Sequence, residues 1–342
     1  VTVRRALDRL ADHGMVQRLR YRGVQVKPDL DAAALRQSPL TPPQQHLAAT
    51  NSEPGLRKRF AAIMGSQPDE GLVLIQEGIE RYTQENDFEL KLLALDAGGA
   101  HAFDVLRDVE HFDADGIVLL PHPGPEPMSI LEELVRQGIP VVCVEKRSDR
   151  ERLPSVEPDN ASGMYRAVNY LIRRHQRPVF FLGLHFDHRT DAQRYEGYLC
   201  AMRDAGFGDR IEEMTYLHPT YTSDPSYWQE ERKWLHGYET ARQLLADRIP
   251  PISVACLKDY VAWGLYKAAG EAELRVGKDV AVTGFDDLTI AQLLEPPLTT
   301  VQQDLREKGY QAAQLLDMRI VRGTPHPVTV TLPVKLVIRE SA

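Results

Sequence analysis

The pair Asp286-Asp287 occupies the position in this sequence that best suits ligand binding. It directly follows residues 280–284, a short apolar run typical of a strand buried on both faces of a sheet. In an open parallel sheet, ligands bind beyond the carboxyl ends of the strands, so we expect Asp286 to hold a small polar molecule. Asp286 could instead cap the following helix, although Asp287 is equally able to do so.

The sequence gives little support for a metal site, a dinucleotide-binding site or a catalytic nucleophile. One group of residues resembles a set of metal ligands: His185, Asp187, His188 and Asp191. No second ligand cluster at helical i, i+4 spacing accompanies it, so we expect no metal. The glycines form no dinucleotide fingerprint, and no nucleophile elbow occurs. We therefore expect neither a cofactor nor catalysis.

Composition and charge point to a multidomain protein with a basic end. The 342 residues exceed the size of a single core, and no apolar run approaches the roughly 20 residues that span a bilayer. Three widely spaced cysteines and the lack of a signal-peptide pattern favour a cytoplasmic protein. Residues 1–28 hold seven basic and two acidic side chains, a balance of +5, whereas the whole chain carries −8, which leaves −13 on the remainder. This asymmetry favours a nucleic-acid-binding arm on an acidic body.

Residues 1–28 have the pattern of a helix followed by a basic hairpin. Residues 2–13 place apolar side chains on one helical face, Gly14 ends the helix, and two short strands, 15–19 and 24–27, flank a tight turn. The order of these parts and the run RLRYRG at 18–23 resemble the C-terminal part of the GntR-type winged-helix DNA-binding domain. The resemblance implies that the DNA contacts come from Thr2, Arg4, Arg5, Arg20, Arg22 and Gly23. The other interpretation is a solvated charged helix beside a hairpin.

Residues 1–28 cannot bury a core of their own, so we expect roughly 40 further residues upstream of Val1. Residues 29–55 contain scattered prolines without a sustained period, which indicates a linker. Strand and helix patterns then alternate from residue 56 to the end, which predicts an α/β body of two doubly wound parallel sheets with crossovers at a hinge. We expect the first lobe at about 56–158 and 304–326, and the second at about 159–300 and 327–342, so that the last strands lie in the second lobe.

The body resembles the effector-binding core of LacI/GalR-type regulators, which is similar to periplasmic sugar-binding proteins. The motifs that carry the resemblance are DGIVLLP (115–121), IPVVCV (139–144), DNASG (159–163), RYEGY (194–198), VGKDVAVTGFDD (276–287), PPLTTVQQ (296–303) and LVIRES (336–341). A GntR-like head on such a body is typical of the arabinose repressor type. The resemblance implies a homodimeric repressor of carbohydrate-utilisation genes, with operator DNA and a sugar, sugar acid or sugar phosphate as partners. The alternative is a solute-binding receptor without a role at DNA.

By this resemblance Arg194 is the cationic donor to ligand and Asp286 the acceptor, although Arg194 could be a surface arginine instead. Lys258 stands where relatives often have Asn, which favours an acidic or phosphorylated ligand unless the side chain turns outward. Glu145 takes the place of a common aspartate, and Gln303 could bridge the lobes. Weaker candidates from the first lobe are Ser66, Gln67 and His122.

Overall fold

The computed structural model describes residues 16–19, 23–26, 57–65, 69–95, 102–120, 134, 136–146, 153–186, 188–221, 230–322 and 328–342. The chain divides into two compact units, residues 1–56 and 57–342, each described by itself. The first unit contains β1 (Val16–Leu19) and β2 (Gly23–Val26), an antiparallel pair in which Leu19 faces Gly23. The predicted hairpin is thus confirmed. The helix expected at 2–13, the linker, and Thr2, Arg4, Arg5, Arg20 and Arg22 lie outside the described residues.

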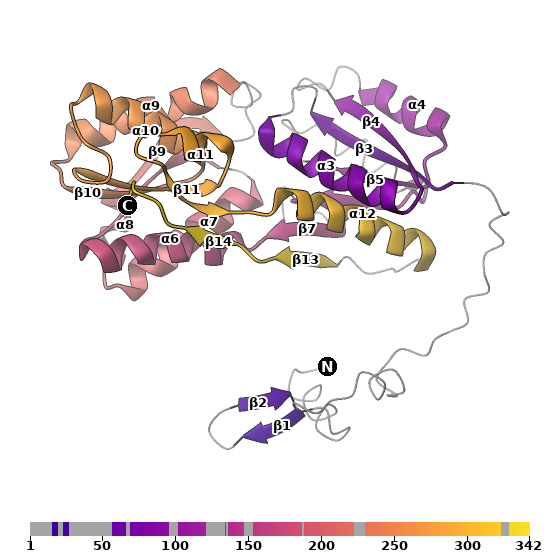
Figure 1. The fold of residues 1–342 in the computed structure, drawn as a ribbon, viewed down its shortest axis with the longest axis horizontal. Coiled ribbons are helices and arrows are strands. Elements are labelled where there is room, and N and C mark those ends of the chain that lie inside the picture. Colours follow the sequence, from indigo (N-terminus) through magenta and orange to yellow (C-terminus); the bar gives the residue numbers. More distant parts are fainter. Residues whose placement is uncertain are drawn as a thin grey trace. The chain divides into compact units, whose positions relative to one another are not determined.

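The second unit is built on two six-stranded sheets (Figure 1). The first sheet has the order β13-β7-β6-β5-β3-β4, and all its strands are parallel. Its strands are β3 (Arg59–Gly65), β4 (Glu89–Leu95), β5 (Gly116–Leu119), β6 (Val141–Val144), β7 (Ser155–Pro158) and β13 (Thr329–Leu332). The second sheet has the order β14-β12-β11-β10-β8-β9, in which only β14 is antiparallel to its neighbour. Its strands are β8 (Phe180–His185), β9 (Thr215–Tyr221), β10 (Ile252–Cys256), β11 (Val280–Asp286), β12 (Thr299–Gln302) and β14 (Lys335–Val337).

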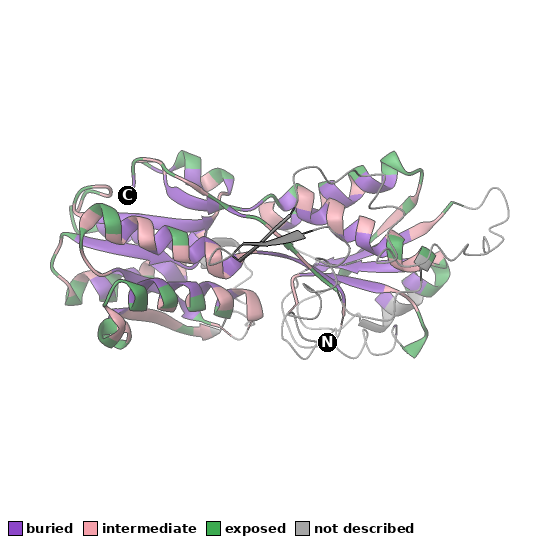
Figure 2. Cartoon of the chain, turned by 90° about the horizontal axis from the view of Figure 1, so that it is seen from below, coloured by how far each residue is buried: buried purple, intermediate pink, exposed green. Residues whose placement is uncertain are grey.

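Helices cover both sheets and leave the central strands buried, as Figure 2 shows. The helices are α3 (Glu70–Glu85), α4 (Ala102–Phe112), α6 (Asn160–His175), α7 (Arg189–Asp204), α8 (Ile211–Met214), α9 (Glu230–Asp247), α10 (Asp259–Glu271), α11 (Thr289–Leu293) and α12 (Leu305–Arg322). In α6 the apolar residues Met164, Val168 and Leu171 recur at helical spacing and are fully buried, while Asp159 caps the first turn through the Ser162 N–H at 3.2 Å. No helix of the described part of the chain is both long and apolar enough to cross a membrane.

The predicted α/β architecture with two sheets is confirmed, but the route of the chain between the sheets differs in one place. β13 does not return to the second lobe; it pairs in parallel with β7 of the first sheet, and only β14 joins the second sheet. Pro333 separates the two strands, and a proline has no N–H with which to continue a ladder. The first sheet also contains β7, a strand that the sequence pattern did not predict. The chain therefore passes between the sheets after β7, after β12 and between β13 and β14.

Helices α3 and α12 cross so closely that only glycine fits at the contact. A Cβ atom on Gly309 would lie 1.9 Å from the carbonyl oxygen of Ile75, and one on Gly78 would lie 1.9 Å from the carbonyl oxygen of Arg306. Either atom would force the backbones apart, since real Cβ atoms do not approach within 3.0 Å of another heavy atom. This crossing holds the first turns of α12 in place against the first sheet.

We expect Gly309→Ala to lower the free energy of unfolding by about 1–3 kcal/mol, because the added methyl group overpacks a backbone contact. The matched control is Gly270→Ala in α10, where an added Cβ meets nothing within 4 Å. There the helix propensity of alanine predicts a neutral change or a gain of up to about 1 kcal/mol. Urea unfolding of both variants measures the difference, and equal stabilities would contradict the close crossing.

Candidate functional site

The predicted ligand residues Arg194, Asp286, Lys258, Glu145 and Gln303 are brought together by the ends of strands from both sheets. Asp286 ends β11, Lys258 follows β10 and Gln303 follows β12 in the second sheet. Glu145 follows β6 in the first sheet, and Arg194 lies on α7. The carboxyl ends of parallel strands are the usual place for a ligand. The remaining predicted contacts, Ser66, Gln67 and His122, lie outside the described residues.

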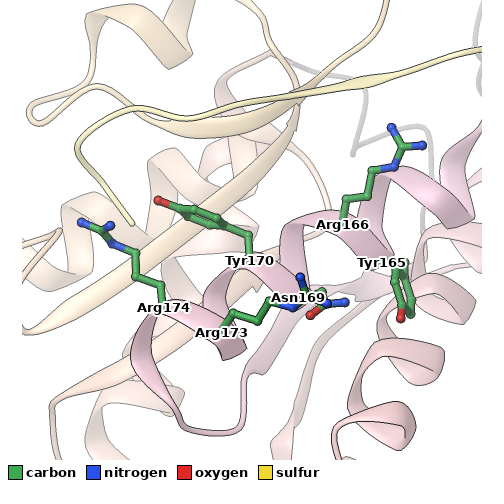
Figure 3. A pocket seen from close by; sticks show the side chains of 6 residues that line it. All are labelled: Tyr165, Arg166, Asn169, Tyr170, Arg173 and Arg174. Carbon is green, nitrogen blue, oxygen red and sulfur yellow. The ribbon is translucent and has the colours of Figure 1, made fainter.

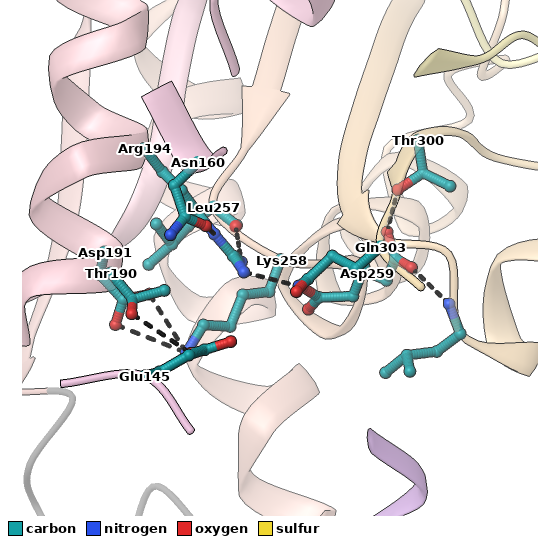
Figure 4. Close-up of polar contacts among 12 residues, drawn as sticks. Glu145, Asn160, Thr190, Asp191, Arg194, Leu257, Lys258, Asp259, Thr300 and Gln303 are labelled. Atoms are coloured by element: carbon teal, nitrogen blue, oxygen red, sulfur yellow. Dashed lines mark hydrogen bonds and ion pairs between the residues drawn. The ribbon is translucent and has the colours of Figure 1, made fainter. Parts of the chain in front are cut away.

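Arg194 is buried and fixed on every side of its guanidinium group. Only 2% of the residue is exposed, so the alternative of a surface arginine is wrong. Its Nε donates to Asn160 Oδ1 at 3.1 Å, its Nη1 to the carbonyl oxygen of Leu257 at 3.0 Å, and its Nη2 to Asp286 Oδ1 at 2.9 Å (Figure 4). The group also lies 3.8 Å from the ring centroid of Phe285. A planar donor held by this many partners has one orientation.

Asp286 has one carboxylate oxygen in use and one still available. Its Oδ1 accepts from Arg194 and from Gln303 Nε2, the latter at 2.5 Å. Among the described residues no donor contacts Oδ2, although 14% of the side chain is exposed. Burial raises the pKa of Asp286, while the charges of Arg194, Lys258 and Lys308 oppose that shift. Oδ2 can therefore accept a hydrogen bond from a ligand hydroxyl.

Neither Asp286 nor Asp287 caps helix α11, which was the other interpretation of Asp286. The Thr289 N–H donates to Glu70 Oε1 at 3.0 Å, and the N–H of the preceding residue donates to Asp259 Oδ2 at 2.9 Å. The backbone also departs from ordinary geometry here, since φ is 120° at Asp286 and 58° at Asp287. Non-glycine residues in this region are strained, and such residues cluster at functional sites.

Lys308 is a member of the site that sequence reasoning missed. It is the fourth residue of α12, is 1% exposed, and donates from Nζ to Gln303 Oε1 at 2.6 Å. The same Nζ forms an ion pair with Glu145. A signal was present: Lys308 occupies the buried stripe of α12 between Leu305 and Ala312, where an apolar residue is expected.

Glu145 is the carboxylate that the first lobe contributes. Besides Lys308, it accepts from Thr190 Oγ1 of α7 at 3.2 Å, so this contact joins the two lobes. Burial acts to raise the pKa of Glu145, but the charge and hydrogen bond of Lys308, with help from Arg194 and Lys258, lower it to about 2. Its φ of 61° is left-handed, as at the two aspartates after β11.

Lys258 points into this group of residues and does not turn outward. Its Nζ lies 3.3 Å from Asp191 Oδ1, and 18% of the lysine side chain is exposed (Figure 4). Asp191 belongs to the first turn of α7, as does Arg189, which pairs with Glu157 at the end of β7. The N-terminal half of α7 therefore contacts residues of both sheets.

Asp259 is a second acidic residue beneath the site, and it is closed off from solvent. It is fully buried, and its oxygens accept from Thr300 Oγ1 at 2.6 Å and from the Leu288 N–H at 2.9 Å. Burial, together with the nearby charge of Asp286, raises the pKa of Asp259 well above its usual range. Gly284 makes room for this carboxyl group, because a Cβ there would lie 2.3 Å from Asp259 Oδ1. Asp259 supports the end of β11 from below.

Other features of the described residues do not compete with this site. They contain no group of three or more His, Cys, Asp or Glu residues that could hold a metal ion. A surface hollow of about 470 Å³ is lined by residues of α6, which Figure 3 shows: Tyr165, Arg166, Asn169, Tyr170, Arg173 and Arg174. None of the predicted ligand residues lines it. The hinge-side group around Arg194 and Asp286 is therefore the candidate ligand site.

Comparison with known proteins finds similarity to a domain family and to regulators of transcription. The profile of the periplasmic binding protein-like domain matches residues 168–342. The transcriptional repressor PurR of Pasteurella multocida is 28% identical over 60% of this chain and 57% of its own length. The transcriptional regulator RegA of Clostridium saccharobutylicum is 28% identical over 78% of this chain and 76% of its own length. The chain thus spans less than two thirds of the PurR relative.

The structure of the transcriptional regulator CelR in complex with cellobiose is similar in fold and extent. It superposes with a TM-score of 0.70 at 26% identity and covers 84% of this chain and 86% of its own. The likeness therefore includes both lobes and the connections between them.

We expect Glu145→Gln to destabilise the protein at neutral pH and to matter less as the pH falls. The pKa of Glu145 is about 2 in the folded chain and about 4.3 in an unfolded one, so its stabilisation is complete above about pH 5. It is lost as the pH falls from about 4 to about 2, and its size is of order 3 kcal/mol.

Urea unfolding at pH 7, 5, 4 and 3 measures this convergence of wild type and variant. The control is Glu213→Gln, which removes a half-exposed carboxylate paired with Arg210. Its effect should be small and sensitive to salt. A stability difference for Glu145→Gln that stays constant over this pH range would contradict the ion pair.

Proposed function

The chain belongs to the family of periplasmic binding protein-like domains, and from this premise we propose that it is a ligand-responsive transcription regulator. In this proposal a sugar or sugar derivative binds between the two lobes and changes the affinity of the N-terminal region for operator DNA. The observation that carries the proposal is the buried chain of contacts from Arg194 through Asp286 and Gln303 to Lys308 and Glu145. Within this chain of contacts, Asp286 Oδ2 is an acceptor oxygen that no described donor occupies.

The polar groups of the site suit a polyhydroxylated molecule. The carboxylates of Asp286 and Glu145 are partly exposed and accept hydrogen bonds, while the ammonium group of Lys258 donates them. A sugar hydroxyl does both at once, so neighbouring hydroxyls fit an acceptor beside a donor. The cellobiose complex of CelR supports this choice, because that regulator is similar over both lobes.

The lobes can respond to a ligand because polar side chains of one lobe contact the other beside three connecting segments. Thr190 reaches Glu145, Arg189 reaches Glu157, and the side chain of Thr289 donates to Glu70 at 2.6 Å. A ligand that favours the closed arrangement of these contacts shifts the population towards it. A coupling of about 1–3 kcal/mol to the DNA-binding region would suffice for regulation.

For the DNA-binding part we propose a GntR-type winged helix, with Thr2, Arg4 and Arg5 on the recognition helix and Arg20, Arg22 and Gly23 in the wing. The antiparallel pair of β1 and β2 and the basic charge of residues 1–28 support this assignment. The regulators PurR and RegA among the relatives favour a role at DNA over a solute receptor. Symmetric operators are read by pairs of heads, so we propose a cytoplasmic homodimer formed through the body.

The ligand site is tested by thermal unfolding against a panel of pentoses, hexoses, disaccharides, sugar acids and sugar phosphates. A ligand at about a hundred times its dissociation constant should add about 2.7 kcal/mol of stability. Asp286→Asn and Arg194→Met should each abolish most of that shift, because they remove a charged member of the site. The control is the exposed pair Arg275 and Asp279, whose variants Arg275→Met and Asp279→Asn should keep the full shift. Full shifts in both site variants would refute the assignment.

DNA binding is tested with a labelled duplex at increasing salt. Exchanging Arg18, Arg20 and Arg22 for Gln should weaken binding and lower the slope of log affinity against log salt by about 2–3, since each phosphate contact contributes about 0.9. The control with the same charge change is the α6 triple variant at Arg166, Arg173 and Arg174, which should bind as wild type does. If the α6 variant weakened binding and the hairpin variant did not, the DNA contacts would lie on the body. If the wild-type chain bound no DNA at low salt, the proposed role would be refuted.

A further inference from the structure

The charged side chains of the site differ in how far a ligand can reach them. Lys258, Glu145 and Asp286 expose 18%, 16% and 14% of their side chains. Lys308 and Arg194 expose 1% and 3%. A ligand therefore meets two carboxylates and one ammonium group, while the other two cations lie behind the carboxylates.

Each cation of the site is matched by a carboxylate. Arg194 pairs with Asp286, Lys308 with Glu145, and Lys258 with Asp191. The first two pairs neutralise the carboxylates from the protein side. In the third pair, Asp191 balances the ammonium group of Lys258, which would otherwise favour an acidic ligand. Among the described residues of the site, no cation is left to balance the charge of a carboxylated or phosphorylated molecule.

Lys308 also fixes the amide of the residue that links the pairs. Gln303 accepts from Lys308 through Oε1 and donates to Asp286 through Nε2. A cation beside the amide oxygen sets which end of the amide faces Asp286. Lys308 therefore acts on the ligand through Glu145 and Gln303 and is a positioning residue.

We propose that the buried ion pair of Lys308 and Glu145, in which neither charge is left uncompensated, makes this site selective for an uncharged polyhydroxylated ligand over carboxylated or phosphorylated ones. The proposal rests on the ligand site proposed above and narrows its ligand class. An anionic ligand would present acceptor oxygens to the ligand-facing oxygens of Glu145 and Asp286, which also only accept. A neutral sugar hydroxyl would donate to the same oxygens without adding charge. The balance is local: an unpaired lysine in place of the Lys308–Glu145 pair would attract anions.

The test compares uncharged and anionic probes on the wild-type chain by calorimetry. The uncharged probes are ribose, arabinose, glucose, galactose and cellobiose, and the anionic probes are gluconate and glucose 6-phosphate. We expect the best uncharged probe to bind at least about tenfold more tightly than either anion, the size of one charge-assisted hydrogen bond. An anion that binds as well as the best sugar overturns this inference and leaves the regulator proposal standing. A chain that binds no probe overturns the ligand site itself.

Three variants then assign the selectivity to the pair. Glu145→Gln uncovers the charge of Lys308, so the preference for the uncharged probe should fall by about tenfold or reverse. Lys308→Arg keeps the charge and should keep the preference. The double variant Lys308→Met with Glu145→Gln restores the charge balance, so it should regain the preference although the affinity is lower. This last readout separates charge selectivity from a merely structural role.

The matched control is Asp317→Asn in the C-terminal half of α12. It removes the carboxylate that pairs with Lys58, whose Nζ lies 2.5 Å from Asp317 Oδ1. Its ratio of uncharged to anionic affinity should equal that of the wild type. If the ratio for Glu145→Gln also equals that of the wild type while the variant remains folded, the pair of Lys308 and Glu145 does not set the selectivity.

Discussion

The ion pair between Arg194 and Asp286 is the interaction on which the rest of the site depends. A guanidinium group removed from water is costly unless every side of it finds a partner. Here the partners come from α6, from the end of β10 and from the end of β11, and a phenyl ring covers one face. The helices and strands of the second sheet must therefore meet in one arrangement for Arg194 to be buried. That arrangement also holds the carboxylate of Asp286 at the edge of the sheet.

Side-chain hydrogen bonds connect this fixed arrangement of the second sheet to the first sheet. Gln303 lies directly after β12, where the chain leaves one sheet for the other, and it links Asp286 to Lys308. Lys308 is held in turn by the close crossing of α12 with α3, where Gly309 touches the backbone of Ile75. The groups proposed to bind the ligand are thus attached to both cores.

Strands, helices and the role of strand ends could be predicted from the sequence, because apolar periods and the rule for parallel sheets are local. The position of Asp286 after its strand followed from this, and the resemblance to a known family suggested Arg194. Lys308 was missed because a lone lysine in a helix is normally solvated, and its burial depends on Glu145, more than 160 residues away. β13 was placed in the wrong lobe because its partner, β7, is itself a short strand without a strong pattern. Such pairings between residues far apart in the chain cannot be predicted from a local sequence pattern.

The position of Gln303 on a connection between the lobes limits how such a protein can change over time. An exchange that retunes how tightly a ligand is held at Asp286 also alters the segment about which the lobes move. The affinity for the ligand and the extent of the conformational response therefore change together when this residue is substituted. In the proposed site, residues that would face the ligand from a single lobe, such as Lys258, are the places where specificity can change while the response is preserved.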